Sequence, residues 1–409
     1  MIKSILLHYS YTLFLINLIL IPNILLGSRW IYQAELLETS TKNNEDINEL
    51  IGSVIINKED ITLTTNRAII YSNDDRLELF GDIIMISNED TIKCDSLYYF
   101  PSDNEHFVTS GSIKLLNKNR LLTSDSLYFW PGNDSVYASG NVYLEDKEST
   151  LNSKSLRYWK TDGYNGYSFI ANDNVILHSS ENQIKGKTIM YTDSTQNLMI
   201  MDSTKTPYGA SIINDKQKIF GENILIHFKD SLIQNIAING DPLIYNTVEA
   251  KSSSNDELLS YFEDEMYGEA IDVIYENNEP KELKIKGMAN SRYNVVDNLL
   301  YEGYNEVSGD TIVLSFINED IDRIQVDGGC RGAFYPNMLN SDLDTTIYYE
   351  ADKIDYRINE ELNYFYNNAI INHSDTELES EYIAVNWATN ELISYKIDEI
   401  KPQVISADN

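Results

Sequence analysis

The sequence predicts an all-β protein that is built from an antiparallel repeat of roughly twenty strands. Two observations carry this prediction. An eight-residue pattern repeats along the chain, and a segment of alternating apolar and polar residues with a central glycine lies between its copies. The chain also has 29 Tyr and only 8 Pro. Tyr is enriched in β-strands and Pro is depleted in them, so both counts favour a β-protein. After residue 28 no segment has the apolar periodicity of a helix of ten or more residues.

The eight-residue pattern is clearest at Ile92–Tyr99, Leu122–Phe129 and Leu151–Tyr158. Its sixth residue is a central apolar residue, which we call the anchor. A small residue lies three before the anchor, an apolar residue five before it, and a large apolar residue usually two after it. Side chains in a strand alternate between two faces. These four positions therefore share one face only if the strand bends, and a small side chain suits a tight corner. The anchors are Ala68, Leu97, Leu127, Leu156, Ile189, Ile224, Ile271, Ile312, Ile354 and Ile383.

The second strand of each repeat alternates around a glycine. Apolar residues lie two and four positions on either side of Gly81, Gly111 and Gly140, which predicts a strand with one buried face. Turn-forming residues separate the two strands, so each repeat is expected to be a hairpin. Weaker copies centre on Gly52, Asp173, Gly240, Gly287 and Gly328, and the turns are predicted at Ser72–Asp75, Pro101–Asn104 and Pro131–Asp134.

Residues 1–28 are predicted to be an export signal. Lys3 gives a positive start, an apolar stretch covers residues 5–26, and Gly27 and Ser28 offer small residues for cleavage. The stretch is also long enough to span a bilayer, so an uncleaved membrane anchor is the alternative. Either way the rest of the chain is expected to be exported.

The net charge of -33 argues against binding to nucleic acid, because phosphate contacts need Lys and Arg. Cys94 and Cys330 are expected to be two buried thiols without a disulfide. No His pair has the spacing of metal ligands, and the acidic Asp95 and Asp125 recur with the repeat and are expected to face solvent beside the bend. We therefore predict no catalytic residue, no metal and no cofactor, and we do not expect an enzyme.

The segment from Ser124 to Leu144 joins the eight-residue pattern to Ala-Ser-Gly-Asn-Val-Tyr-Leu, and in this it resembles the repeat of the OstA/LptA family of lipopolysaccharide-transport proteins. The resemblance is strongest over residues 60–180 and continues to about 395. It implies a β-jellyroll shaped as a V-shaped trough, whose apolar interior shelters acyl chains and whose open sheet ends stack on neighbours. We assign residues 29–250 to jellyroll repeats and residues 251–409 to divergent repeats that continue the same sheet.

The function that this resemblance implies is periplasmic lipid binding, with lipopolysaccharide sheltered by its lipid A acyl chains during transfer from the inner to the outer membrane. The implied partners are lipopolysaccharide and other jellyroll-bearing transport proteins, which stack edge to edge, or a second copy in a homo-oligomer. A structural or adhesive β-solenoid-like surface protein without a lipid ligand is the alternative, and an enzyme on a β-helix is a third hypothesis. The residues expected to line the trough, or otherwise to fill a closed core, are Leu97, Tyr99, Ile113, Leu115, Leu127, Phe129, Val142, Leu144, Leu156 and Tyr158.

Overall fold

The structure is a computed structural model that describes residues 30–406, apart from 43–44, 59–60, 88–89, 102–104, 118–119, 131–134, 162–165, 180, 206, 208, 231, 254–257, 319, 340–344, 390 and 396–400. The described residues form strands and turns and contain no helix, so none of their elements is a helix that could cross a membrane. The predicted export signal at residues 1–28, the predicted turn at Pro131–Asp134 and most of that at Pro101–Asn104 lie outside the described residues.

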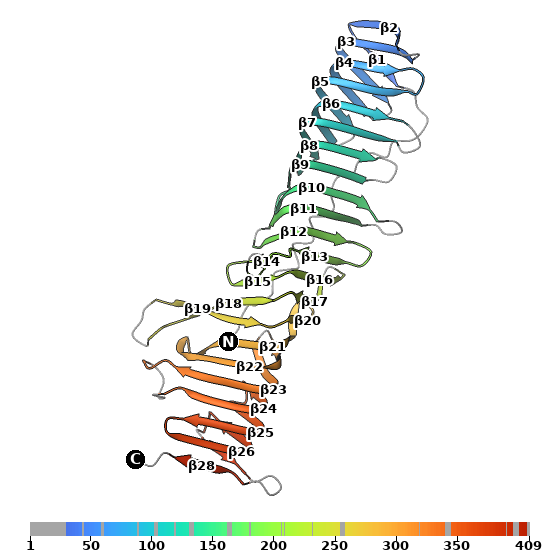
Figure 1. Cartoon of the computed structure of the whole chain (residues 1–409). Helices are drawn as coiled ribbons and strands as arrows, with labels where there is room; N and C mark the ends of the chain where they lie inside the picture. Colours follow the sequence, from blue (N-terminus) through green and yellow to red (C-terminus); the bar gives the residue numbers. More distant parts are fainter. Residues whose placement is uncertain are drawn as a thin grey trace. The chain divides into compact units, whose positions relative to one another are not determined.

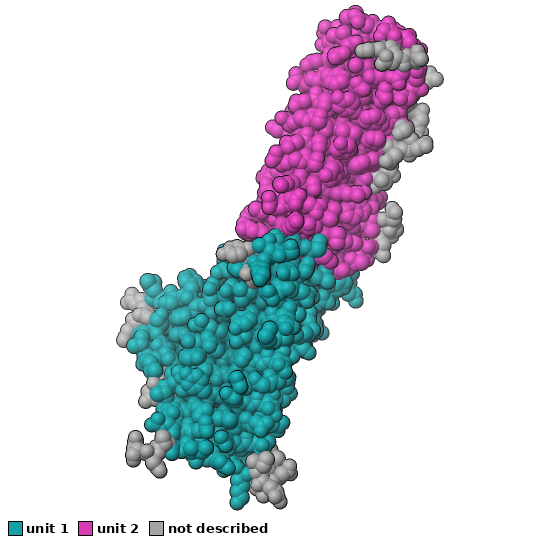
Figure 2. All heavy atoms as spheres, in the orientation of Figure 1, with its two compact units in different colours: residues 1–11, 201–409 teal, residues 12–200 magenta. Residues whose placement is uncertain are grey.

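The chain divides into two compact units, with the boundary between Ile200 and Met201 (Figure 2). We call the N-terminal part, which is magenta and labelled unit 2 in Figure 2, the first unit, and the C-terminal part, which is teal and labelled unit 1, the second unit. In the first unit the strands are β1 (Ile31–Gln33), β2 (Leu36–Lys42), β3 (Glu45–Lys58), β4 (Ile61–Tyr71), β5 (Arg76–Ser87), β6 (Asp90–Phe100), β7 (His106–Asn117), β8 (Arg120–Trp130), β9 (Ser135–Glu145), β10 (Thr150–Lys160), β11 (Tyr167–His178) and β12 (Gln183–Thr192). The boundary falls within β13 (Asn197–Met201).

The second unit continues with β14 (Ala210–Ile213), β15 (Gln217–Gly221), β16 (Asn223–Lys229), β17 (Leu232–Asn239), β18 (Leu243–Ala250), β19 (Ser260–Tyr267), β20 (Ala270–Glu276), β21 (Glu279–Asp297), β22 (Leu300–Ile317), β23 (Asp320–Pro336), β24 (Ile347–Arg357), β25 (Leu362–His373), β26 (Thr376–Asn386), β27 (Glu391–Ser394) and β28 (Gln403–Ser406).

The strands pair antiparallel, as predicted. In the first unit each strand from β3 to β12 lies beside its neighbours in chain order, and the same holds from β21 to β26 in the second unit (Figure 1). The 28 strands in the described part of the chain outnumber the roughly twenty expected. The excess arises because several layers are divided into two shorter strands.

A bend crosses the middle of the long strands, as the phase change of the repeat predicts. Between β8 and β9, Thr123 pairs with Tyr143 and Ser126 pairs with Ser139, so three steps along β8 face four along β9. This is a β-bulge, which kinks the strands and leaves its extra residue unpaired. The same register shift recurs between neighbouring long strands in both units.

The backbone of the bend is left-handed on the glycine strand. Gly140 has φ +76° and Asn141 has φ +48°, and Gly111 with Ser112 repeats this pair at +77° and +33°. Glycine carries no steric penalty in that region, which explains its return in the repeat. The weaker copy without glycine follows the same rule, since Asp173 has φ +64° and Asp is among the residues that tolerate it.

The bend places both halves of each strand with their apolar side chains on one side. In β8, Leu122 and Ser124 before the bend and Leu127 and Phe129 after it are all buried. The small residue at the corner has a second role, because the Ser124 hydroxyl donates to the Ser126 carbonyl across the bulge at 3.1 Å. Ser153 repeats this contact with Ser155 at 3.1 Å. The hydroxyl is not required at every corner, because Gly186 and Ala351 occupy the same position in later repeats.

We call the two halves the anchor arm and the opposite arm. The anchor arm contains the anchors, for example residues 126–130 of β8, and the opposite arm contains the small corner residues, for example residues 120–124. The arms face each other, as one strand of the second unit shows directly. Tyr349 and Tyr356 of β24 lie on different arms, yet their hydroxyl oxygens are 2.9 Å apart. Seven residues of straight strand would span about 23 Å, so β24 folds back on itself and the interior lies between the arms.

In part of the second unit the strands do not continue across the bend, so each arm is formed by separate, shorter strands. The opposite arm is formed there by β15, β18 and β19, and the anchor arm by β16, β17 and β20. The two arms rejoin in β21, which pairs with both β19 and β20. The last layers at the chain ends are also divided, because β1 and β2 both pair with β3, and β27 and β28 both pair with β26.

Replacing Gly140 by Ala tests the bend. A Cβ there would lie 2.7 Å from Cβ of Asp125, whereas at Gly81, with φ +81°, the nearest atom would be Asn66 Nδ2 at 3.4 Å. Both variants carry the left-handed penalty of about 1–2 kcal/mol, and only Gly140→Ala adds the clash. Urea unfolding should therefore show a loss in Gly140→Ala that exceeds the loss in Gly81→Ala by about 1 kcal/mol or more. Equal losses would contradict the close packing of the corner.

Candidate functional site

The ten residues predicted to line the interior all point inward and are buried, each with at most 5% of its surface exposed. They come from both arms. Leu97, Tyr99, Leu127, Phe129, Leu156 and Tyr158 lie on the anchor arm, and Ile113, Leu115, Val142 and Leu144 lie on the opposite arm. The interior of the first unit is thus apolar on both sides, and its side chains are packed together.

Aromatic rings run along the anchor arm near its outer end. The ring centroids of Tyr99 and Phe107 are 4.8 Å apart, and those of Phe107 and Phe129 are 5.7 Å apart. Further along, the rings of Tyr158 and Tyr167 stack at 4.7 Å. Such rings provide large apolar surface, so this arm offers a continuous apolar wall across successive strands.

A buried lysine closes the interior at the N-terminal end of the first unit. The ammonium group of Lys58, on the opposite arm, donates to the Tyr99 hydroxyl at 3.2 Å and lies 3.6 Å from Glu105. The Tyr99 hydroxyl donates to Glu105 at 2.6 Å. Lys58 also lies 5.2 Å from the centroid of the Trp30 ring. These contacts join the ends of the two arms, and a buried charge needs such partners. Burial, followed by the hydrogen bond to Glu105, raises the pKa of Tyr99.

The interior of the second unit is more polar, and this was not predicted. Asn246, Asp264 and Asn305 are inward-facing and buried, with Tyr349 and Tyr356 close to Asn305. The repeat contained a signal for part of this set. Asp264 and Asn305 both stand seven residues before an anchor, and the earlier repeats carry Asp90, Ser149 and Asn182 at that position.

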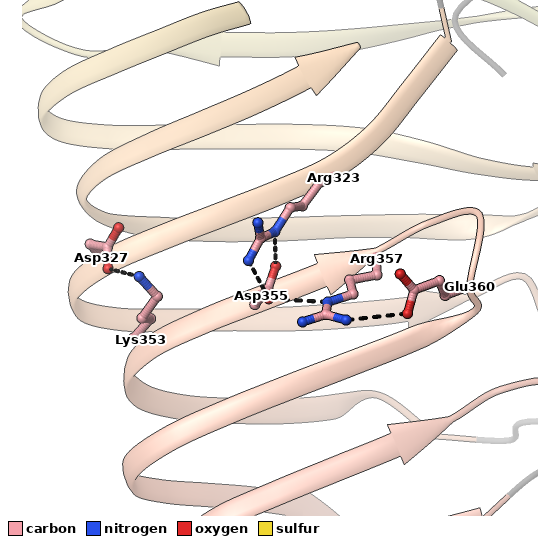
Figure 3. A network of polar contacts seen from close by, with 6 residues as sticks. All are labelled: Arg323, Asp327, Lys353, Asp355, Arg357 and Glu360. Carbon is pink, nitrogen blue, oxygen red and sulfur yellow. Dashed lines mark hydrogen bonds and ion pairs between the residues drawn. The ribbon is translucent and has the colours of Figure 1, made fainter. Parts of the chain in front are cut away.

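The outer face of the second unit carries an ion-pair network around Asp355 (Figure 3). Arg323 donates to both carboxylate oxygens of Asp355, at 2.6 and 2.7 Å, and Arg357 lies 3.4 Å away. Burial opposes the charged form of Asp355, but Arg323 and Arg357 outweigh it and lower the pKa. Arg357 also reaches Glu360, and Lys353 pairs with Asp327 at 2.9 Å. The network links neighbouring strands on the surface away from the interior.

The two thiols are free and buried, as predicted. Burial, followed by the charge of Asp95, raises the pKa of Cys94 to about 12, and burial, followed by Asp327, raises that of Cys330 to about 11. Both are therefore protonated and unreactive at neutral pH. Asp95 and Asp125 are exposed beside the bend, also as predicted. Among the described residues, no three or more His, Cys, Asp or Glu side chains gather in a group that could hold a metal ion.

Bent antiparallel strands whose two arms bury their inward faces define a repeat-built β-jellyroll. Residues 29–187 match the family model described as OstA-like protein, which confirms the resemblance predicted from the repeats over this part of the chain. Among solved structures, the chain is similar to LptH from Pseudomonas aeruginosa, described as the LptA-homologous periplasmic component of a conserved lipopolysaccharide transport device. The identity is 10%, the TM-score is 0.26, and the similarity covers 34% of this chain and 90% of LptH. No curated protein matches the chain.

The carboxyl group of Asp264 should make the stability of the second unit depend on pH. Burial raises its pKa to about 6, against the opposing hydrogen bonds from Asn294 and Asn246. As the pH rises, the unfolded chain loses this proton at about pH 4, whereas the folded chain keeps it until about pH 6. The free energy of unfolding should therefore fall between about pH 4 and about pH 6 and change no further above that. The loss corresponds to about 3 kcal/mol.

Asp264→Asn is the matched variant, because its side-chain oxygen can still accept the hydrogen bonds from Asn294 at 2.7 and 2.9 Å. Urea unfolding of both proteins at pH 4, 5, 6 and 7 should show that the variant gains stability relative to the parent as the pH rises. Curves that stay parallel over this range would show that Asp264 titrates normally in the folded protein.

Proposed function

We propose that this chain is a periplasmic lipid-binding protein that holds the acyl chains of lipopolysaccharide between its two arms during transfer from the inner to the outer membrane. The observation that carries the proposal is the apolar interior of the first unit, which is lined from both arms by ten predicted residues. The OstA-like match over residues 29–187 supports it, as does the description of LptH as a transport component.

Lipid must displace packed side chains, because the interior is filled. This displacement is energetically feasible because contacts between side chains are exchanged for contacts with the acyl chain. Each methylene taken out of water is worth about 0.8 kcal/mol, so a chain of about twelve carbons gains roughly 9 kcal/mol. The apolar side chains of the arms lose contacts with one another but gain contacts with the acyl chain and remain out of water. The bend acts as the hinge, since it joins the arms along one side only.

Binding of a lipid in the interior requires no chemical reaction. Leu127 and Val142 offer only contact surface, and the aromatic wall of the anchor arm adds area along the path. Transport by such a surface consists of binding and release between neighbouring sites of similar affinity. We therefore assign the chain a binding role, with no catalytic residue and no cofactor.

The ends of the sheet are the proposed contact points for partners. At the first unit β1 and β2 pair only with β3, and at the second unit β27 and β28 pair only with β26, within the described residues. Free strand edges present unpaired backbone groups that another sheet can complete. A jellyroll of another transport protein, or a second copy of this chain, fits this geometry.

The full burial of the interior also favours the second candidate, a structural or adhesive β-protein with no lipid ligand. Photo-crosslinking in cells separates the two. Leu127 and Val142 face inward and are buried, whereas their neighbours Asp125 and Asn141 are exposed. A photoreactive amino acid at either inward position should capture lipopolysaccharide, because only an opened interior brings acyl chains to it, and the same group at the outward positions should not.

The outward probes are the control, since they differ from the inward ones in face but hardly in location. Equal labelling of both sets would indicate unspecific adhesion of lipid to the surface. If the inward probes capture no lipopolysaccharide in folded, exported protein, the transport proposal is wrong and the structural or adhesive candidate is favoured.

A further inference from the structure

Polar side chains cross the inner face of the opposite arm in the second unit. Asn246 of β18 pairs directly with Asp264 of β19, and Tyr293 of β21 pairs directly with Asn305 of β22. Asn246, Asp264 and Asn305 are each at most 5% exposed. Asn294 connects the two pairs, because its backbone N–H and its side-chain amide donate to Asp264 Oδ1 at 2.7 and 2.9 Å.

Turn chemistry does not explain these residues. In the first unit, polar residues at the corresponding positions serve hairpin turns, as where the amide and hydroxyl of Ser149 both donate to Asp146. In the second unit Asn246 and Asp264 lie inside β18 and β19, and Asn305 lies inside β22. A strand interior makes its backbone hydrogen bonds to its neighbours and needs no polar side chain there.

The cluster extends to the anchor arm. The hydroxyl of Tyr349 donates to Asn305 Oδ1 at 2.7 Å, and the hydroxyl of Tyr356 donates to that of Tyr349 at 2.9 Å. Tyr356 lies on the anchor arm, so the polar groups of the cluster lie between the arms. This is the place that the apolar lining residues occupy in the first unit.

Two atoms of this face lack a hydrogen-bond partner. Asn305 Nδ2, a donor, and Gln217 Oε1, an acceptor, are both buried without one. Gln217 of β15 pairs directly with Asn246, so it continues the same row of side chains, and Gln217 and Asn305 are 3% and 4% exposed. A buried polar atom without a partner costs free energy that a well-packed apolar residue would avoid. The two atoms lie on β15 and β22 with β18, β19 and β21 between them, about 19 Å apart along the sheet, so a ligand that partners both must be extended and must supply an acceptor and a donor.

We propose that this cluster is a binding site for a neutral, hydroxyl-rich saccharide, such as the sugar portion of a glycolipid whose acyl chains lie in the apolar interior. The inference rests on the proposed function, because the arms must part to admit the ligand. Hydroxyl groups both donate and accept, which matches the free amide donor of Asn305 and the free acceptor of Gln217. The cluster has no Lys or Arg, so it does not suit phosphate groups. Its chemistry consists of amides, phenols and the carboxyl group of Asp264.

Binding of three ligands to the full chain tests the site: lipopolysaccharide, its deacylated saccharide fraction, and dodecanoate as an acyl chain without a sugar. The parent protein should bind all three. Asn305→Leu should weaken binding of the saccharide fraction at least tenfold and leave dodecanoate unchanged. Asn235→Leu, at an exposed position of β17, is the matched control and should bind like the parent. Gln217→Leu removes the other free atom from a different strand and tests the same point if Asn305→Leu does not fold.

The outcomes separate this site from the proposed function. A parent protein that binds dodecanoate but not the saccharide fraction overturns the saccharide site and leaves acyl-chain binding in place. Saccharide binding that is unaffected in both folded Leu variants also overturns it. Saccharide binding without dodecanoate binding supports the site and contradicts the acyl-chain proposal.

Discussion

The left-handed bend in the middle of the strands is the constraint on which the rest of the structure depends. A straight strand with apolar residues at five and three before the anchor, at the anchor and at two after it would expose half of them. In β8 the inward phase changes between Ser124 and Leu127, and the bulge at Gly140 and Asn141 takes up the extra residue of β9, so both arms bury their faces against each other. The layers with continuous long strands make the same corner, and stacking such layers adds length. The interior is therefore a consequence of the backbone at the corner.

Under the proposed function, the same geometry allows a filled interior to hold a lipid. The arms are covalently continuous only at the bend, and at their outer ends they are held together by side chains. In the first unit those contacts include Lys58, Tyr99 and Glu105, and the rest of the interface is apolar packing without direction. Apolar contacts exchange readily for others of the same kind, whereas the hydrogen bonds between strands stay intact when the arms part. A lipid site of this kind needs no preformed cavity.

Much of the fold could be predicted from the sequence because one repeat position has one structural role. The bend, the inward faces and even the corner at Asp173, which lacks glycine, follow from the spacing. The division of layers in the second unit could not be predicted, because the spacing there still fits a bent strand. The polar cluster was missed for another reason. Asp264 and Asn305 resemble turn residues of earlier repeats by position, and only the pairing of β18, β19 and β22 places them inside strands.

The central claim is that the arms part to admit lipid, and a removable link between them tests it most directly. Lys58→Cys and Glu105→Cys place thiols at the outer ends of the two arms, and Cys94→Ala and Cys330→Ala remove the two native thiols from every protein in the comparison. A bismaleimide that contains a reducible disulfide should join the two new thiols. Linked protein should bind lipopolysaccharide at least tenfold more weakly than either single-cysteine protein, and reduction of the linker should restore binding. Equal binding by linked and reduced protein would contradict the account.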